Sequence, residues 1–192
     1  MPWVKSSHEE TLKKYPHLKD FLPFLDVSNA ESPRGSVLVA CSFLDDQLRT
    51  IIDNYLVEDS DKAQLLDGFN APLGTFASRI KSAHCLGLIS DEERDDCDTL
   101  RKIRNEFAHN VRTSFADSKP VDLCKNLHHS AKDHGDVIVD AYGQFSTGAT
   151  GLVLNLVNRA HYVSRSRLKK QKWPRQFKNG CYALSAADLN AV

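Results

Sequence analysis

The chain has 192 residues, 41% of them hydrophobic and 26% charged, which are ordinary values for a globular protein. No run of about 18 apolar residues is present, so no membrane-spanning helix is expected. The N-terminus also lacks the apolar run of a secretory signal. The five cysteines contain no C-x-x-C pair, so neither a disulfide framework nor a zinc ribbon is indicated. We therefore expect a cytoplasmic protein that does not bind a membrane, with Cys41 and Cys85 as small core residues.

The charge is divided unevenly along the chain. Residues 141–192 contain eight of the 25 Lys and Arg residues but only one of the 25 Asp and Glu residues. The formal net charge of zero therefore combines an acidic body with a basic C-terminal part. This asymmetry predicts that the basic part meets either an anionic partner or the acidic body of the same chain.

The first third of the chain has the apolar periodicity of helices. A short helix is expected over residues 8–19, ending near Pro23. Ser32 and Pro33 are residue types favoured at the N-cap and at the first position of a helix, and they open a long one. Its apolar residues recur at helical spacing: Val37, Ala40, Cys41, Leu44, Leu48, Ile51, Ile52 and Tyr55. A short helical turn is expected over about residues 60–66.

The middle of the chain contains two more helices. One is expected over residues 75–84, after a turn at residues 70–74. Ser90 and Glu93 form a capping box, in which each side chain accepts a backbone N–H of the other residue. The helix that this box opens is expected to extend to about His109.

The last part of the chain is less regular. Residues 121–133 are expected to form a short helix and residues 150–168 the last helix. Val137 to Val139 fit either a strand or a helical turn. Together these elements predict an all-α fold, a helical bundle followed by a basic C-terminal tail.

Arg104, Asn105 and His109 lie near the end of the helix that starts after Ser90. Positions five apart on an ideal helix are about 140° apart, so Arg104 and His109 share a face only if the last turn unwinds. Asn105 and His109, four apart, do share a face. A structural role explains these residues: His109 suits the helix dipole, Asn110 suits the C-cap, and Arg104 suits a carboxylate on a neighbouring helix.

The same segment resembles the Arg-x4-6-His motif of HEPN domains, helical bundles that often act as metal-independent ribonucleases. The resemblance implies an endoribonuclease in which Arg104 and His109 of two subunits surround the scissile phosphate, with Asn105 orienting it. A neutral His can accept the proton of a ribose 2′-OH, and a guanidinium can stabilise charge on the phosphorane oxygens. This interpretation needs a homodimer and stays an alternative to the structural one.

Three ordered blocks carry a second resemblance, which spans roughly residues 32–127. The blocks are residues 34–46 (RGSVLVACSFLDD), residues 71–81 (APLGTFASRIK) with residues 86–89 (LGLI), and residues 103–110 (IRNEFAHN). In order and spacing they resemble the mannitol operon repressor (MltR) family. The resemblance implies an all-helical fold and a role as a repressor in the regulation of mannitol uptake or related genes. It does not imply direct DNA binding, so a protein partner is expected.

Six residues within these blocks are candidate motif residues: Arg34, Asp45, Asp46, Pro72, Gly74 and Arg79. We expect a turn at Pro72 to Gly74, in which the glycine permits a positive φ. For Arg79 and Lys81 a solvated helix face is favoured over an anion-binding site. The two aspartates are expected to receive Arg104 across a helix pair.

No metal and no cofactor are expected. His128, His129 and His134 are close together in the sequence, but no second cluster of ligating residues supports a metal site. The sequence has neither an H-E-x-x-H motif nor a Gly-rich phosphate loop after a strand.

Basic and aromatic residues alternate in the C-terminal part. The candidate nucleic-acid-binding residues are Arg165, Arg167, Lys169, Lys170, Lys172, Trp173 and Arg175. Cations neutralise phosphates and aromatic rings stack on unpaired bases, so RNA or DNA is one expected partner. The alternative is a tail that rests on the acidic body.

The chain is thus expected to have three parts. Residues 1–31 form a helical lead-in, residues 32–168 an MltR-like helical domain, and residues 169–192 a basic tail. The main hypothesis is a regulatory protein that acts on transcription through a protein partner and is not an enzyme. The alternatives are a HEPN-type ribonuclease and nucleic-acid binding through the tail.

Overall fold

The computed structural model describes residues 3–171, and side chains from residue 8 onward. In this part of the chain eight α-helices and two 3-10 helices are present, and the only β pairing is an isolated bridge between His134 and Val137. The elements are α1 (Trp3–Lys14), η1 (Pro16–Leu18), α2 (Phe21–Ala30), α3 (Pro33–Tyr55), α4 (Lys62–Leu66), α5 (Phe76–Cys85), α6 (Asp91–His109), α7 (Ser118–Lys125), α8 (Ala141–Val163) and η2 (Ser164–Ser166). The predicted all-α fold is confirmed. No described helix is long and apolar enough to span a membrane.

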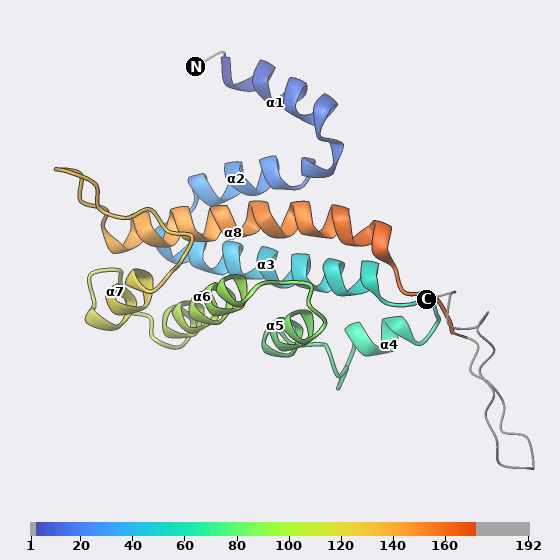
Figure 1. Cartoon of the computed structure of the whole chain (residues 1–192). Coiled ribbons are helices and arrows are strands. Elements are labelled where there is room, and N and C mark those ends of the chain that lie inside the picture. The colour runs from blue at the N-terminus through green and yellow to red at the C-terminus, as the bar shows by residue number, and fades with distance from the viewer. Residues whose placement is uncertain (1–2, 172–192) are drawn as a thin grey trace, which may run out of the picture.

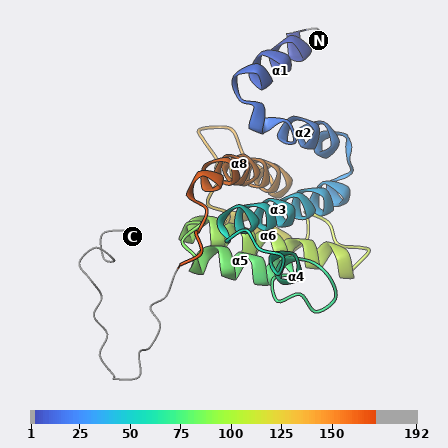
Figure 2. The ribbon, with the colours of Figure 1, turned by 90° about the vertical axis from the view of Figure 1, so that its right-hand side faces the viewer.

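The long helices α3 and α8 lie side by side in the centre of the bundle (Figure 1). On one side of this pair lies α2, and on the other lie α5 and α6, so the helices form three layers (Figure 2). Leu44 and Leu48 of α3 and Leu152 and Leu156 of α8 are among the fully buried apolar side chains of the core. Burying one such side chain contributes roughly 1.5–3 kcal/mol to the free energy of folding, so the buried side chains of α3 and α8 stabilise the bundle.

Helices with clear start signals in the sequence form where they are expected. Ser32 accepts a hydrogen bond from the Gly35 N–H at 3.1 Å and caps α3. Thr75 and Ser90 each form a capping box at the start of α5 and of α6. These contacts satisfy backbone N–H groups that have no partner within the helix, and so they fix where each helix begins.

The first helix, expected over residues 8–19, has other bounds in the structure. The first helix ends at Lys14, and a separate helix, α2, contains Pro23 in its first turn. Proline is tolerated there because the backbone N–H of that turn has no partner within the helix. Phe21 and Phe24 of α2 are only 7% and 4% exposed, so α2 contributes directly to the core.

The last two helices also differ from the expectation. Helix α7 covers residues 118–125 instead of 121–133, and α8 begins at Ala141 instead of residue 150. Asp140 caps α8 by accepting the Gly143 N–H at 2.7 Å. A Cβ atom on Gly148 would lie 3.3 Å from Leu127 Cδ1, so this glycine lets the loop before α8 pack closely.

Two smaller expectations are corrected as well. Val137 to Val139 form neither a strand nor a helical turn, because only Val137 pairs, in the isolated bridge with His134. Cys41 is buried as expected, but Cys85 is exposed at the end of α5.

Candidate functional site

Arg34, the first residue of the first block, binds the end of α6, where the third block lies. Its guanidinium donates hydrogen bonds to the backbone carbonyls of Phe107, Asn110 (3.0 Å), Val111 (2.7 Å) and Thr113 (3.1 Å). It also lies over the Phe107 ring, 5.4 Å from the centroid. The last carbonyls of a helix lack partners within it, and a cation is favoured at this end of the dipole. Arg34 therefore acts as a C-terminal cap supplied by another helix.

Arg79, in the second block, is 7% exposed and joins three segments. Its Nη1 donates to Asp45 Oδ1 at 2.8 Å, its Nε to the Leu73 carbonyl at 2.9 Å and its Nη2 to the Leu66 carbonyl at 2.9 Å. The solvated helix face expected for Arg79 is therefore wrong, whereas Lys81 is exposed. A buried guanidinium is stable only when its donors are satisfied, and these acceptors supply that.

A groove of about 290 Å³ opens between α3, α5 and α6, and we call it the α3–α5–α6 groove. All three blocks contribute to it, together with Arg101. Its lining residues are Cys41, Ser42, Asp45, Thr75, Phe76, Ala77, Arg101, Arg104 and Asn105. The sequence blocks that lie far apart in the chain therefore converge on one surface feature.

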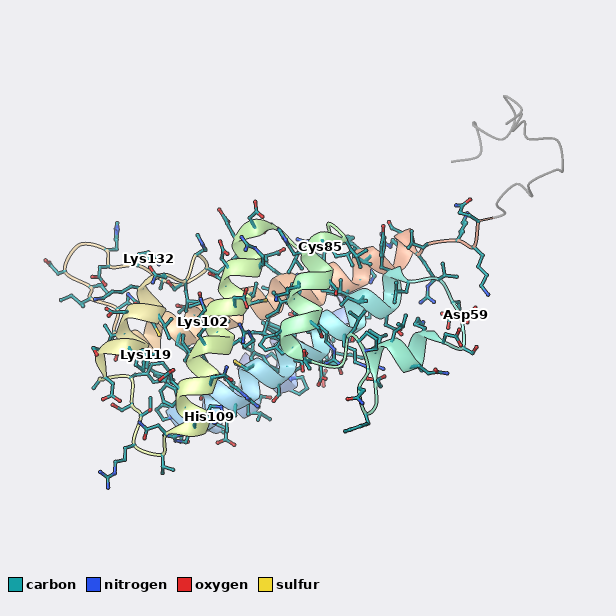
Figure 3. All side chains as sticks on the ribbon, turned by 90° about the horizontal axis from the view of Figure 1, so that it is seen from below. Asp59, Cys85, Lys102, His109, Lys119 and Lys132 are labelled. Carbon is teal, nitrogen blue, oxygen red and sulfur yellow. The ribbon has the colours of Figure 1, made fainter. Side chains whose placement is uncertain are left out.

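Arg104 and Asn105 line this groove, but His109 does not. Helix α6 stays regular through His109, and the Asn110 N–H donates to the Glu106 carbonyl at 3.2 Å. Arg104 and His109 of one chain therefore project about 140° apart, as on an ideal helix. Figure 3 places His109 at the C-terminal end of α6. Arg104 is exposed, and its Nη1 donates to Asn105 Oδ1 at 3.3 Å.

Two groups that line the groove, Asp45 and Cys41, have shifted pKa values. Burial raises the pKa of Asp45, while its hydrogen bond with Arg79 and the nearby Arg104 charge act in the opposite direction. Burial likewise raises the pKa of the Cys41 thiol to about 12, so this cysteine is a protonated thiol at neutral pH. Cys41 is therefore not an activated nucleophile.

Three expectations about the block residues need correction. Asp45 receives Arg79 rather than Arg104, and Asp46 is exposed on the surface of α3. Gly74 does not have a positive φ; the turn instead places positive φ values at Gly68 and Asn70. A Cβ on Gly74 would lie 3.0 Å from the Ala71 carbonyl oxygen, so glycine is favoured by close packing. Pro72 is exposed in this turn.

Sequence reasoning missed a buried carboxylate, Asp96 of α6, which is 1% exposed. It accepts the backbone N–H groups of His128 (2.8 Å) and His129 (3.0 Å), and it lies 2.8 Å from His129 Nδ1. This carboxylate holds the loop between α7 and α8 against α6. Within residues 3–171 no group of three or more His, Cys, Asp or Glu residues is placed to hold a metal ion.

A second buried carboxylate, Glu93, is 4% exposed and was expected only as part of the capping box. Besides the Ser90 N–H at 2.9 Å, it accepts Arg159 Nη2 at 3.1 Å. Arg159 also donates to the Leu88 carbonyl at 2.6 Å, so α8 is joined to the start of α6. Nothing local in the sequence indicates this pairing, because the two residues are 66 positions apart.

Residues 167–170, which lead into the basic tail and begin it, rest on the acidic body. Arg167 pairs with Glu58, Lys170 pairs with Asp59, and the Leu168 N–H donates to the Tyr55 carbonyl at 2.8 Å.

The other described cations among the nucleic-acid-binding candidates are placed differently. Arg165 contacts His161 Nε2 at 2.9 Å, and Lys169 is exposed. Lys172, Trp173 and Arg175, the other nucleic-acid-binding candidates, lie outside the described residues.

The fold and the site define an all-α bundle with an open, arginine-lined groove. No family model matches the sequence, and no curated protein matches it either. Among solved structures, the chain is similar to MtlR in the X-ray structure of the MtlR-HPr complex from Escherichia coli. The TM-score is 0.55 at 22% sequence identity, and the match covers 75% of this chain and 98% of that chain. The chain therefore has the MtlR fold, and the resemblance to mannitol operon repressors is confirmed at the level of the fold.

Proposed function

We propose that this chain is a cytoplasmic regulatory protein that resembles mannitol operon repressors and acts on transcription by binding a protein partner. One observation carries the proposal: the fold matches 98% of a chain that was solved in complex with HPr. A partner of the HPr type is therefore the first candidate for this chain. The α3–α5–α6 groove adds support, because the three blocks that carry the family resemblance meet there.

The experiment is a pull-down with the tagged full-length chain and purified HPr, with E. coli MtlR as the positive control. Retention of HPr by both proteins is the expected result. Transcription of sugar-uptake operons is then compared between a deletion strain and its parent. If MtlR retains HPr and this chain retains none, and transcription is also unchanged, the proposal fails.

The ribonuclease alternative is favoured by one observation, the exposed Arg104 with Asn105 beside it in an open groove. Because α6 stays helical through His109, the base would have to come from His109 of a second subunit. RNA cleavage in EDTA by the wild type and by His109→Ala tests this alternative. Equal cleavage by the two proteins removes it, and loss of cleavage with His109→Ala supports it.

Nucleic-acid binding through the tail remains a third candidate. Arg167 and Lys170 already pair with carboxylates of the same chain, so nucleic acid would have to displace those contacts. Such binding depends on counterion release and should weaken strongly between about 50 and 200 mM salt. A titration with single-stranded RNA at those two salt concentrations tests it, and salt-independent binding argues against the electrostatic mechanism.

A further inference from the structure

Two histidine rings from distant parts of the chain stack on each other, outside the α3–α5–α6 groove. His17 lies in η1 and His161 in the last turn of α8. Their ring centroids are 4.3 Å apart, and the ring planes differ by 14°. Both side chains line a pocket of about 290 Å³ between η1, α3 and α8. The pair therefore lies where the N-terminal lead-in, which carries α1 away from the bundle, meets α8 (Figure 1).

The hydrogen bond of His161 requires its neutral form. Its Nε2 lies 2.9 Å from Nη2 of Arg165, which belongs to η2. A guanidinium can only donate, so this Nε2 must have a free lone pair and accept. A proton on Nε2 would remove the hydrogen bond and place two cations in contact. The observed contact therefore exists only while His161 is uncharged.

The contacts of His17 add a second reason. Asn158 Nδ2 donates to the Leu154 carbonyl at 2.9 Å, so the amide turns its Oδ1 toward His17. That oxygen accepts from His17 Nε2 at 2.8 Å. A neutral or a charged His17 can make this bond, because its Nε2 carries a proton in both cases. Two charged rings stacked at this distance would repel each other, so the stack also favours a neutral His161.

The pH at which His161 gains its proton follows from these neighbours. Partial loss of solvent at the ring lowers the pKa of His161 below its ordinary 6.5, and His17 and Arg165 act in the same direction. A pKa that is lower in the docked arrangement means that protonation opposes docking. The contribution of the pair is therefore present above about pH 6.5 and is lost as pH falls from there through the pKa of docked His161.

The other titratable side chains around the pair come from both ends of the contact. On the α1 side, Tyr15 packs edge-on against His17, and Lys14 lies over the Tyr15 ring. On the α8 side, Tyr162 packs edge-on against His161. Lys14 thus adds a further cation near the stack, which acts against a charged His161.

The pocket adds one carboxylate to these groups. Asp20, just before α2, is exposed and lines the pocket. Exposed charges are screened by water and salt, so Asp20 offsets the neighbouring cations only in part. The α3 residues that line the pocket are neutral: Gln47, Thr50 and Asn54.

From this geometry we infer that the stacked pair of His17 and His161 is an acid-sensitive latch, which holds η1 and α1 on α8 at neutral pH and releases them as His161 gains a proton. Leu18 of η1 is 9% exposed, and its burial opposes release. The latch therefore shifts the fraction of open molecules instead of opening all of them. Helix α2 stays docked, because Phe21 and Phe24 lie in the core. Opening widens the pocket, since η1 forms one of its walls.

Hydrogen exchange of the full-length chain measures the latch. The Leu18 and Lys19 N–H groups donate to the carbonyls of Tyr15 (3.0 Å) and Pro16 (3.3 Å), in a turn too short to persist once it leaves α8. Their protection factors, corrected for the pH dependence of intrinsic exchange, are compared at pH 7.5 and 5.5. One proton, one unit below the ordinary histidine pKa, can change them by up to about tenfold, so a fall of about threefold or more is expected. The Leu73 N–H, in the turn before α5, is the internal control and should change by less than about twofold.

Histidine 1H–13C NMR spectra recorded between pH 8 and 5 identify the group that gains the proton. The His161 midpoint is expected below 6.5, and the protection of Leu18 should fall over the same pH range. A His161 midpoint at or above 6.5 would overturn the inference, and so would unchanged protection of Leu18.

A variant assigns the response to the pair. His161→Phe keeps an aromatic ring that can stack but cannot be protonated, so the pH response of Leu18 should disappear. His84→Phe is the matched control, because His84 pairs with Asp91 in another part of the surface, and it should keep the wild-type response. A response that persists in His161→Phe means that another group drives it, and the latch is then wrong.

Arg165→Gln gives a test that does not depend on how well a phenylalanine packs. Removing the cation should raise the His161 midpoint toward 6.5, and the pH at which Leu18 loses protection should rise with it. If either midpoint stays at the wild-type value, the inference fails. None of these measurements involves a protein partner, so failure of the latch leaves the proposed function unchanged.

Discussion

Arg79 of α5 and Arg104 of α6 both act on Asp45, which lines the α3–α5–α6 groove, but the two arginines are used differently. On the α5 side, Arg79 is buried, and its donors are taken by Asp45 and two loop carbonyls. On the α6 side, Arg104 is exposed, and its side chain donates a hydrogen bond to the amide oxygen of the neighbouring Asn105. Both arginines belong to blocks that resemble one family, so such blocks combine residues that build the fold with residues that are open to a ligand.

The largest expected effect is the loss of stability when the side chain of Arg79 is removed. Arg79→Ala leaves Asp45 and the carbonyls of Leu66 and Leu73 without their donor, so the free energy of unfolding should fall by about 3 kcal/mol. Urea denaturation measures it. Arg104→Ala is the control and should change stability by less than about 0.5 kcal/mol, as surface substitutions usually do. Equal effects of the two variants would remove the distinction.

The next effect concerns the end of α6. Arg34→Ala removes a donor shared by several carbonyls, and it should cost about 1–2 kcal/mol. Hydrogen exchange should become faster locally, at Asn110 and Thr113, whose N–H groups close the turn after α6. Arg34→Lys should recover part of the loss because it keeps the cation. If exchange accelerates evenly over the whole chain, Arg34 does not act as a local cap.

The two aspartates bound by arginines should have pKa values that are shifted in opposite directions. Burial raises the pKa of Asp45 above its ordinary 3.8, and the hydrogen bond with Arg49 lowers the pKa of Asp67 below it. The contribution of Asp45 to stability therefore declines as pH rises from its unfolded pKa through its folded pKa. That of Asp67 is present above the unfolded pKa and is lost as pH falls through the folded one. Carboxyl 13C NMR titration checks the order, and Asp67 titrating above Asp45 would refute it.

The smallest effect is expected at the basic tail. Glu58→Gln and Asp59→Asn remove the acceptors of exposed ion pairs with Arg167 and Lys170. Stability should change by less than about 0.5 kcal/mol, because such pairs are solvated and screened. The Leu168 N–H should nevertheless exchange faster, since it donates to Tyr55 only while the tail is docked. Unchanged exchange would mean that the ion pairs do not hold the tail.

Local signals in the sequence predicted the start of α3 and of α6 and the buried stripe of α3. Ser32 and Ser90 act within one turn of chain, so their effect does not depend on the rest of the fold. Pro23 misled the prediction because proline is tolerated in the first turn of a helix, and α2 contains Pro23 there.

The partners of the charged residues could not be predicted. Arg79 bonds a residue 34 positions away and Asp96 a loop 32 to 33 positions away, and no local pattern specifies such pairs. The separation of Arg104 and His109 followed from helix geometry alone. The convergence of the three blocks on one groove required the structure.

The most direct test of the central claim is a calorimetric titration of HPr into the full-length chain, with E. coli MtlR measured alongside. A saturable binding isotherm for both proteins is the predicted result. Saturable binding to MtlR together with no heat of binding to this chain, at concentrations that saturate MtlR, would contradict the claim that this chain works through an HPr-type partner.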